Sequence, residues 1–480
     1  MTDGSFSSHG TTPNSSIGRQ ATRSNTEKTA VMTGNIQALH DDGDDPRSPV
    51  RPSMAANPFP RRASLDLDDY FVGPRDLSRH SKWPMFMRMH GSIVPKMIVP
   101  LLFVGAWTTA IVLISKHVYD LGVESVLLTI TGFVVGLGLS FRSSTAYERY
   151  AEGRRYWQVL TNASHSLGRV FWIHANDPEG QDPRELMLKK VTAMNLVVAF
   201  SVALKHQLRF EPFTAYSDMQ HMIGHLQTFA REATTAQPEK AQGQRKKFFK
   251  EVGEYLGISF ATSNPRKMIK KSEKPLGNLP VEILSHLAIC VDEMCRNDQL
   301  DVPMQQTMAY NNMALLNDCM TGCERVLNTP LPLAYAIAIS QITWVYVLLL
   351  PFQLYSLLDW VAIPATVFAS YIILGLLLIG GEIENPFGTD VNDLPLELYC
   401  EQIAHDMDVI ASHEKRNPQD FVTSDANMPL YPASTAPMSV WMSRSEDKIR
   451  EALKNKPRKM FEMRRQRDAG KSVHQAENMV

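Results

Sequence analysis

Long runs of sequence without any charged residue constrain this chain more than any other feature. Four such runs stand between blocks of polar sequence, and they cover Met97 to Ser115, Ser125 to Phe141, Val326 to Leu358 and Val361 to Gly381. About 20 apolar residues in helical form cross the hydrocarbon of a bilayer. The runs therefore predict four membrane-spanning helices, at about residues 93–115, 123–141, 332–354 and 360–381.

The average composition hides this pattern. Hydrophobic residues make up 44% of the chain and its formal net charge is -1, values that suit a soluble protein as well as a membrane protein. The first thirty residues contain no apolar segment of the kind that a signal peptide needs. The first span is therefore expected to direct insertion into the membrane itself.

Basic residues beside the spans predict the orientation of the chain, because Lys and Arg near short loops are retained in the cytosol. The basic residues before the first span and after the second are Arg75, Arg79, Lys82, Arg88, Lys96, Arg142, Arg149, Arg154 and Arg155. The connections from Lys116 to Glu124 and near Asp359 are short and poor in basic residues. We therefore expect a multi-pass membrane protein with both termini in the cytosol.

The block from residue 142 to 330 is too long for a loop, and its apolar residues recur at helical spacing. We expect a cytosolic helical domain in which prolines separate the helices. The expected helices are Arg184 to Arg209, Tyr216 to Thr234, Lys246 to Gly257, Val281 to Asn297 and Met304 to Leu327. The predicted fold class is an all-α membrane protein with four transmembrane helices per subunit and a long cytosolic helical part.

The two ends of the chain differ from this central part in composition. Residues 1–69 are rich in small and polar residues and hold few large apolar side chains, which predicts a disordered cytosolic tail. Residues 412–480 predict a basic cytosolic tail that either lies on anionic lipid or stays in solution. Phe461 is the one aromatic residue within the basic run, so nucleic-acid binding is not expected.

The second span carries two parallel stripes of side chains. Small residues recur every four positions at Gly132, Gly136 and Ser140, a spacing that lets helices pack closely in lipid. One position further on, an apolar stripe is formed by Phe133, Leu137 and Phe141. If several copies of this helix surround an axis, the apolar stripe makes stacked rings that narrow a pore and close it by dewetting. Alternatively, the same side chains face lipid or a neighbouring helix.

The last span runs into an acidic turn, from Ile379 to Leu396. Its Asn-Pro and Phe-Gly pairs supply the turn chemistry that ends the helix. Four carboxylates crowd the membrane–water boundary there: Glu382, Glu384, Asp390 and Asp393. Charge is costly near lipid and usually has a function, so the turn favours a pore or transport protein.

Several separated motifs occur in one order along the chain. They are Met89 to Met97, Phe141 to Tyr150 with Gly153 to Trp157, Leu204 to Arg209, Gly322 to Arg325, Thr329 to Tyr335 and Glu384 to Pro395. In this order they closely resemble the bestrophin family, in its bacterial and fungal branch. The resemblance covers roughly residues 70–411 and leaves both tails outside.

The resemblance implies a homopentameric channel for chloride and other monovalent anions, in the lipid bilayer and by analogy in the plasma membrane. On this basis Phe133, Leu137 and Phe141 match the hydrophobic neck of the family's pore. Met304 falls where the family narrows the cytosolic end of the pore, and Val302 is the neighbouring candidate.

The acidic turn matches the segment that binds calcium in animal bestrophins. Asp390 and Asp393 match two side-chain ligand positions, and Asn385 matches a backbone-carbonyl position. Thr389, Val391 and Asn392 stand where acidic neighbours would be. Calcium favours six to eight oxygens with substantial negative charge, so no cofactor is expected, and Asp390 and Asp393 remain the candidate metal ligands. Their alternative role is to cap turns and helix starts.

The sequence does not fix the sign of the conducted ion. Candidate cations for a positive vestibule are Lys205, His206, Arg209, Arg154 and Arg155, each of which has a structural alternative such as pairing with Glu148 or Glu152. A cation-permeable bestrophin-like channel and a non-conducting membrane scaffold are the other hypotheses. An enzyme is not expected, because no Ser/His/Asp grouping, Gly-rich phosphate loop or metal-ligand set stands out.

Overall fold

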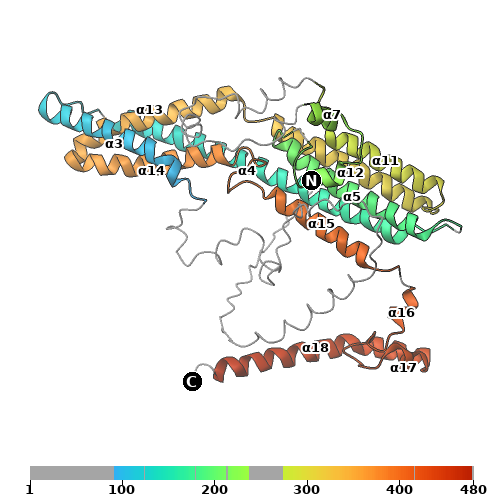
Figure 1. Ribbon diagram of the computed structural model, residues 1–480. Helices are drawn as coiled ribbons and strands as arrows, with labels where there is room; N and C mark the ends of the chain where they lie inside the picture. The colour runs from blue at the N-terminus through green and yellow to red at the C-terminus, as the bar shows by residue number, and fades with distance from the viewer. Residues whose placement is uncertain are drawn as a thin grey trace, which may run out of the picture. The chain divides into compact units, whose positions relative to one another are not determined.

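The computed structural model describes residues 91–123, 125–178, 180–211, 214–236, 274–415 and 417–477 (Figure 1). In these ranges every regular element is a helix and there is no strand, as the predicted all-α class requires. The predicted tail 1–69, the basic residues from Arg75 to Arg88 and the expected helix from Lys246 to Gly257 lie outside the described residues.

Four apolar helical segments pack together as one bundle (Figure 1). They are α3 (Val94–His117), the first part of α4 (Ser125–Arg169), α13 (Leu333–Leu358) and α14 (Ala362–Glu382). These segments cover the four stretches for which the sequence predicts spans. Met97, Val135, Ile339 and Leu374 meet in their shared core. Large apolar side chains also stay exposed on the outside of the bundle, as expected for helices surrounded by lipid.

The helix α4 continues far beyond the predicted end of the second span at residue 141. It runs for 45 residues without a proline and passes into a short π-helix, η3 (Val170–His174). At 1.5 Å per residue its length is about 68 Å, whereas the hydrocarbon of a bilayer is about 30 Å thick. The second half of α4 therefore has to leave the membrane and belongs to the helical domain.

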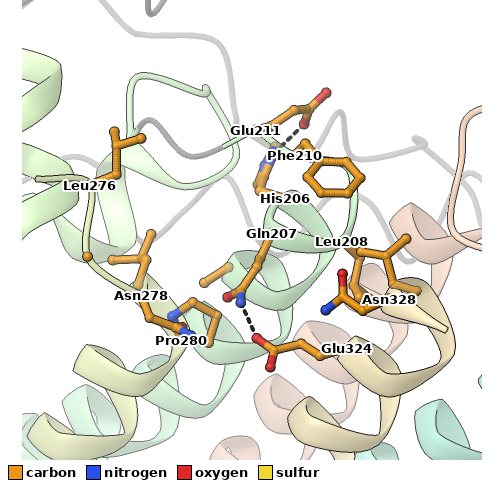
Figure 2. Close-up of a pocket in the computed structure, with 14 residues that line it drawn as sticks. His206, Gln207, Leu208, Phe210, Glu211, Leu276, Asn278, Pro280, Glu324 and Asn328 are labelled. Atoms are coloured by element: carbon orange, nitrogen blue, oxygen red, sulfur yellow. Dashed lines mark hydrogen bonds and ion pairs between the residues drawn. The ribbon is translucent and has the colours of Figure 1, made fainter. Parts of the chain in front are cut away.

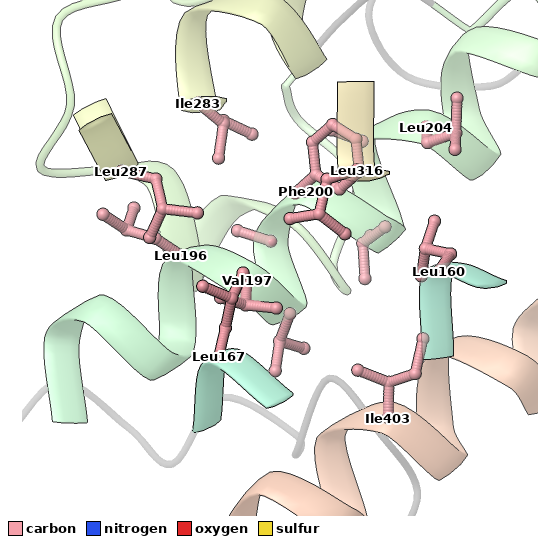
Figure 3. Close-up of a cluster of buried hydrophobic side chains, with 14 of the residues drawn as sticks. Leu160, Leu167, Leu196, Val197, Phe200, Leu204, Ile283, Leu287, Leu316 and Ile403 are labelled. Atoms are coloured by element: carbon pink, nitrogen blue, oxygen red, sulfur yellow. The ribbon is translucent and has the colours of Figure 1, made fainter. Parts of the chain in front are cut away.

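The second half of α4 forms a helical domain with α5 (Pro183–Leu208), α11 (Leu279–Arg296), α12 (Pro303–Asn328) and α15 (Leu396–Ser412). Its core holds fully buried residues from each helix, among them Leu160, Phe200, Leu287, Leu316 and Ile403 (Figure 3). Proline stands in the first turn of α5, α11 and α12, where a missing backbone N–H costs nothing. The expected boundaries of these three helices therefore agree closely with the structure.

The helix expected from Tyr216 to Thr234 is wrong as a single element. The structure has two short helices there, α6 (Gln220–Ile223) and α7 (Phe229–Ala236), and Gly224 follows directly after the first. Glycine carries a large entropic cost in a helix, so the apolar spacing on either side does not suffice to join the two.

The helix α5 is apolar enough to be mistaken for a membrane span. Among the described residues three stretches meet the length and hydropathy of a span, namely Val94–His117, Pro183–Leu208 and Leu333–Glu382. In α5 67% of the most apolar window is buried inside the protein, against 28% and 33% in the other two. A helix that is apolar on all sides lies either in a protein core or in lipid, and the core of the helical domain already covers α5.

The C-terminal part of the described chain is also helical. It consists of α16 (Pro418–Val422), α17 (Met438–Met442) and the long α18 (Glu446–Glu477). The Lys456 ammonium donates to the Pro429 carbonyl, and the buried Trp441 stacks against the Arg444 guanidinium at 4.1 Å. The start of α18 thus packs on the segment before it.

Candidate pore-lining site

Phe133, Leu137 and Phe141 lie on one open face of α4 in its apolar part. Their side chains are 72%, 46% and 58% exposed, while Val135 and Leu139 on the opposite face are buried in the bundle core. A helix turns by about 100° per residue, so residues four positions apart share a face. The stripe is left uncovered by the described part of its own chain and is available to lipid or to further copies of α4.

The small residues next to this stripe differ in their surroundings. A Cβ at Gly132 would come within 2.9 Å of the Tyr346 hydroxyl of α13, so this glycine serves packing inside the chain. A Cβ at Gly136 would meet no atom within 4 Å, and Ser140 is exposed. Close packing of α4 against another copy would therefore use Gly136 and Ser140.

Met304 and Val302 lie at the start of α12, whereas the end of α12 is followed by α13 of the apolar bundle. Val302 is the N-cap residue of α12 and Pro303 is its first residue, which places Met304 in the first turn. The Met304 side chain is 75% exposed and that of Val302 is 44% exposed. Both are uncovered apolar side chains, the property that a constriction requires, and their role at a pore aperture stays a prediction.

The acidic turn is docked against α4 by its aromatic residue. Phe387 is fully buried, and a Cβ at Gly153 would come within 3.0 Å of its ring. Within the turn, the Asp390 backbone N–H donates to the Asp393 carboxylate at 2.7 Å. Gly388 makes room for this carboxylate, because a Cβ there would lie 2.5 Å from the Asp393 oxygen. Asp393 thus has the arrangement of a turn cap, the role that the sequence offers as an alternative to metal binding.

A lysine of α3 bridges two carboxylates of the acidic turn. The Lys96 ammonium lies 3.1 Å from Glu382 and 3.5 Å from Asp390. The other oxygen of Glu382 accepts a hydrogen bond from Asn392 at 2.6 Å, and the same amide also donates to the Gly91 carbonyl. The Glu382 side chain is only 10% exposed, whereas that of Asp390 is 61% exposed. Of the two ion pairs of Lys96, the pair with Glu382 is therefore better shielded from water.

Two arginines of α4 bind the other side of the turn. The Arg142 guanidinium lies 3.8 Å from Glu384. Arg149 donates to the Glu384 backbone carbonyl at 3.1 Å and to the Val326 carbonyl of α12 at 2.6 Å. The turn therefore connects α3, α4 and the end of α12 at one end of the apolar bundle. In the sequence, Lys96, Arg142 and Arg149 indicated only orientation, and their pairing with the turn was missed.

Comparison with known proteins decides the family. The profile described as bacterial/fungal bestrophin protein matches residues 75–409, well over half of the chain. This chain belongs to the bestrophin family. The family inferred from the ordered motifs is thus confirmed, and the matched range includes α3, α4, the acidic turn and most of α15.

Relatives of this bestrophin bear a functional name. A voltage-dependent anion channel-forming protein of Nostoc sp. is 31% identical over 59% of this chain and 76% of its own length. A protein with the same description from Synechocystis sp. is 28% identical over 66% of this chain and 87% of its own length. A solved bacterial bestrophin homologue from Klebsiella pneumoniae is 23% identical with a TM-score of 0.49, over 66% of this chain and 100% of that chain.

The carboxylates of the acidic turn in this bestrophin have partners within the chain. Asp393 accepts a backbone N–H, and Asp390 and Glu382 face the Lys96 ammonium. Calcium requires several further oxygens with negative charge. In the part of the chain that the structure describes, no three His, Cys, Asp or Glu side chains are grouped so that they could hold a metal ion. Lys96 supplies a positive charge beside the turn, and Asn385 accepts a hydrogen bond from the Phe387 backbone N–H.

Three of the five candidate vestibule cations are engaged inside the helical domain. Lys205 and His206 are each only 5% exposed and both bind Asp218. Arg209 forms a two-pronged pair with Glu397 of α15. Ion pairing inside the helical domain therefore describes these three residues better than a place in a vestibule. Arg154 and Arg155 are both exposed on α4, and the Arg154 guanidinium lies over the Tyr399 ring of α15 at 4.6 Å.

His206 occupies the centre of a buried polar cluster. One ring nitrogen lies 2.6 Å from Glu211, the other lies 3.0 Å from Asp218, and the ring stacks on Tyr216 at 4.3 Å. Burial alone would lower the pKa of His206, but the hydrogen bonds to Asp218 and Glu211 outweigh it and raise that pKa. Burial opposes ionisation of Asp218 too, yet His206 and Lys205 hold its pKa well below the ordinary value.

These shifts predict how the stability of the helical domain depends on pH. A raised pKa of His206 stabilises the fold fully below about pH 6.5, and this contribution is lost as the pH rises through the raised value. The lowered pKa of Asp218 contributes above about pH 3.9 and is lost only in stronger acid. We expect the His206→Gln variant to lose about 2 kcal/mol of unfolding free energy at pH 5.5 and less at pH 8.5. Thermal unfolding of the solubilised protein at both pH values measures this difference.

The exposed His225 provides the matched control. The His225→Gln variant should keep the pH profile of the natural protein, because substitutions of exposed side chains change stability little. Equal losses of His206→Gln at both pH values would contradict a charged His206.

A cavity of about 240 Å³ opens next to this cluster, where α5 and α12 end and α11 begins (Figure 2). Gln207 of α5 donates to Glu324 of α12 across it, and His206 lies beside it with Glu211. Leu208, Leu279 and Leu327, one from each of the three helices, also line it. The Gln207–Glu324 hydrogen bond thus links α5 to α12 beside an otherwise partly apolar wall.

Proposed function

We propose that this bestrophin assembles as a homopentamer around a central pore and conducts chloride and other monovalent anions across the membrane. The observation that carries the proposal is the uncovered apolar face of α4, with Phe133 at 72% and Phe141 at 58% exposure. One helix face cannot enclose a pore, so further copies of the chain are required. The names of the Nostoc and Synechocystis relatives, anion channel-forming proteins, support the choice of ion.

Both termini lie in the cytosol and the plasma membrane is the site of action in this proposal. Lys96, Arg142 and Arg149 meet at the same end of the bundle through the acidic turn. At the opposite end the described residues form one ion pair, Lys116–Asp359 at 3.3 Å. Positive charge flanking spans is retained on the cytosolic side, which supports a cytosolic position of the helical domain.

Gating in this proposal needs no calcium. Lys96 already supplies a positive charge to Glu382 and Asp390, and an Asp393 oxygen accepts the Asp390 backbone N–H. A divalent cation would have to displace that ammonium before it gained carboxylate ligands.

The experiment that tests the function is a reversal-potential measurement on the purified protein in planar bilayers. With asymmetric sodium chloride, an anion channel shifts the reversal potential toward the equilibrium potential of chloride. The same currents are expected after calcium is chelated, because the turn is held by protein cations. A reversal potential at the sodium value would assign a cation-permeable channel instead. The absence of any current from folded pentamers would favour the scaffold hypothesis.

A further inference from the structure

The open face of α4 continues past the neck into the helical domain. Beyond Phe141 it carries Ser144, Glu148 and Arg155, all of which are exposed. Arg155 follows Leu137 by about five full helical turns and so has the same angle around the helix axis. Glu148 lies within about 20° of that line.

The buried face of α4 is equally continuous, so the helix does not rotate its faces between the two regions. Val135 and Leu139 lie in the core of the apolar bundle, and Ala146, Trp157 and Leu160 are fully buried further along. The helix has no proline or irregular turn between residues 125 and 169. A residue on the line of Leu137 therefore faces the same side as the neck.

The charged neighbours of Glu148 and Arg155 have partners within the chain. The Arg154 guanidinium lies over the Tyr399 ring of α15 at 4.6 Å. Glu152 pairs with Arg325 of α12. By contrast, Glu148 and Arg155 form no ion pair in the described part of the chain, although each is a full charge on an exposed face. Such charges remain available to ions in an adjoining aqueous space.

We propose that Arg155 and Glu148 form two rings of opposite charge in the vestibule beside the neck, and that Arg155 gives the channel its anion preference while Glu148 limits it. The proposal rests on the proposed function, since it requires the open face of α4 to line the pore. Repetition around the axis places several copies of each charge around one column of water. A vestibule lined by one sign of charge concentrates the opposite ion.

The two rings act over a short range. Along α4, Glu148 lies about 10 Å nearer to the neck than Arg155. The Debye length is also about 10 Å at 0.1 M salt and falls to about 3 Å at 1 M. Each ring therefore acts mainly on ions in its own section of the vestibule, and both effects should weaken in concentrated salt.

The test compares the chloride-to-sodium permeability ratio of two charge-removing variants in the full-length channel. Arg155→Gln is expected to lower the ratio by about threefold or more, and Glu148→Gln to raise it. Arg155→Lys should keep the natural ratio, because the charge is retained. The difference between Arg155→Gln and the natural channel should shrink when the measurements move from 0.1 M to 1 M salt.

Two matched variants remove the neighbouring charges that already have partners within the chain, Glu152 with Arg325 and Arg154 with the Tyr399 ring. Arg154→Gln and Glu152→Gln delete the same charges within a few residues but should leave the ratio unchanged. If the natural channel passes anions and Arg155→Gln has the natural ratio, the charge-ring proposal is overturned while the proposed function stands. An equal fall for Arg154→Gln and Arg155→Gln would also overturn it, because the effect would then not depend on the open face. If the natural protein passes no current, the proposed function itself fails.

Discussion

Replacing Phe133, Leu137 and Phe141 together by alanine is expected to raise the conductance of the channel severalfold. Stacked apolar rings close a pore by excluding water, and alanine both widens each ring and lowers the cost of wetting it. The three side chains are exposed in the chain, so their truncation leaves no cavity in the bundle core. Single-channel recordings of the triple variant in planar bilayers measure the change.

A second triple variant separates the pore face from the lipid face. Leu102, Phe103 and Phe368 have the same composition as the stripe and are 69%, 54% and 67% exposed on α3 and α14. Their replacement by alanine should leave conductance unchanged. Some loss of stability is expected, because Phe103 packs edge-on against Trp344 at 6.3 Å. An equal rise of conductance in both triple variants would argue against a neck on α4.

The sequence predicted the helical elements well because their causes are local. Charge-free runs indicate α3, α13 and α14, and the prolines at positions 183, 280 and 303 mark the first turns of α5, α11 and α12. The end of the second span at residue 141 was predicted from the first charged residue. In the helix itself nothing ends there, since Arg142 is helical and turns its charge to Glu384. Polarity marks the end of the hydrocarbon, not the end of the helix.

The contacts of the site could not be predicted, because they join residues far apart in the sequence. In the sequence, Lys96 stands at the start of the first span and Glu382 at the end of the last, and no periodicity relates them. The face shared by Phe133, Leu137 and Phe141 follows from spacing alone, but only the buried Val135 and Leu139 indicate that this face is the uncovered one. Similarly, Arg154 and Arg155 are adjacent in the sequence, and only the contact of Arg154 with Tyr399 distinguishes them.

Arg149 is expected to be the side chain whose loss most destabilises the link between α4 and the acidic turn. Its guanidinium donates to the backbone carbonyls of Glu384, Val326 and Thr329. The last two carbonyls belong to the end of α12, where the helix leaves carbonyls without partners and favours a positive charge. Replacement by methionine removes all three bonds at once, and each bond to a charged donor contributes about 1.5–3 kcal/mol. The Arg149→Met variant should therefore lose about 3 kcal/mol or more of unfolding free energy, measured by thermal unfolding of the solubilised protein.

Lysine at this position tests whether the geometry or the charge is responsible. A single ammonium cannot reach three carbonyls on two separate elements, so Arg149→Lys should recover less than half of the loss. Full recovery by lysine would assign the effect to charge alone. Arg155→Met, which removes the same charge from the exposed face of the same helix, should change stability by less than about 0.5 kcal/mol. Arg149 and Arg155 thus have separate roles. Loss of Arg149 should lower the stability of the protein, whereas loss of Arg155 should alter the permeability ratio of a normally folded channel.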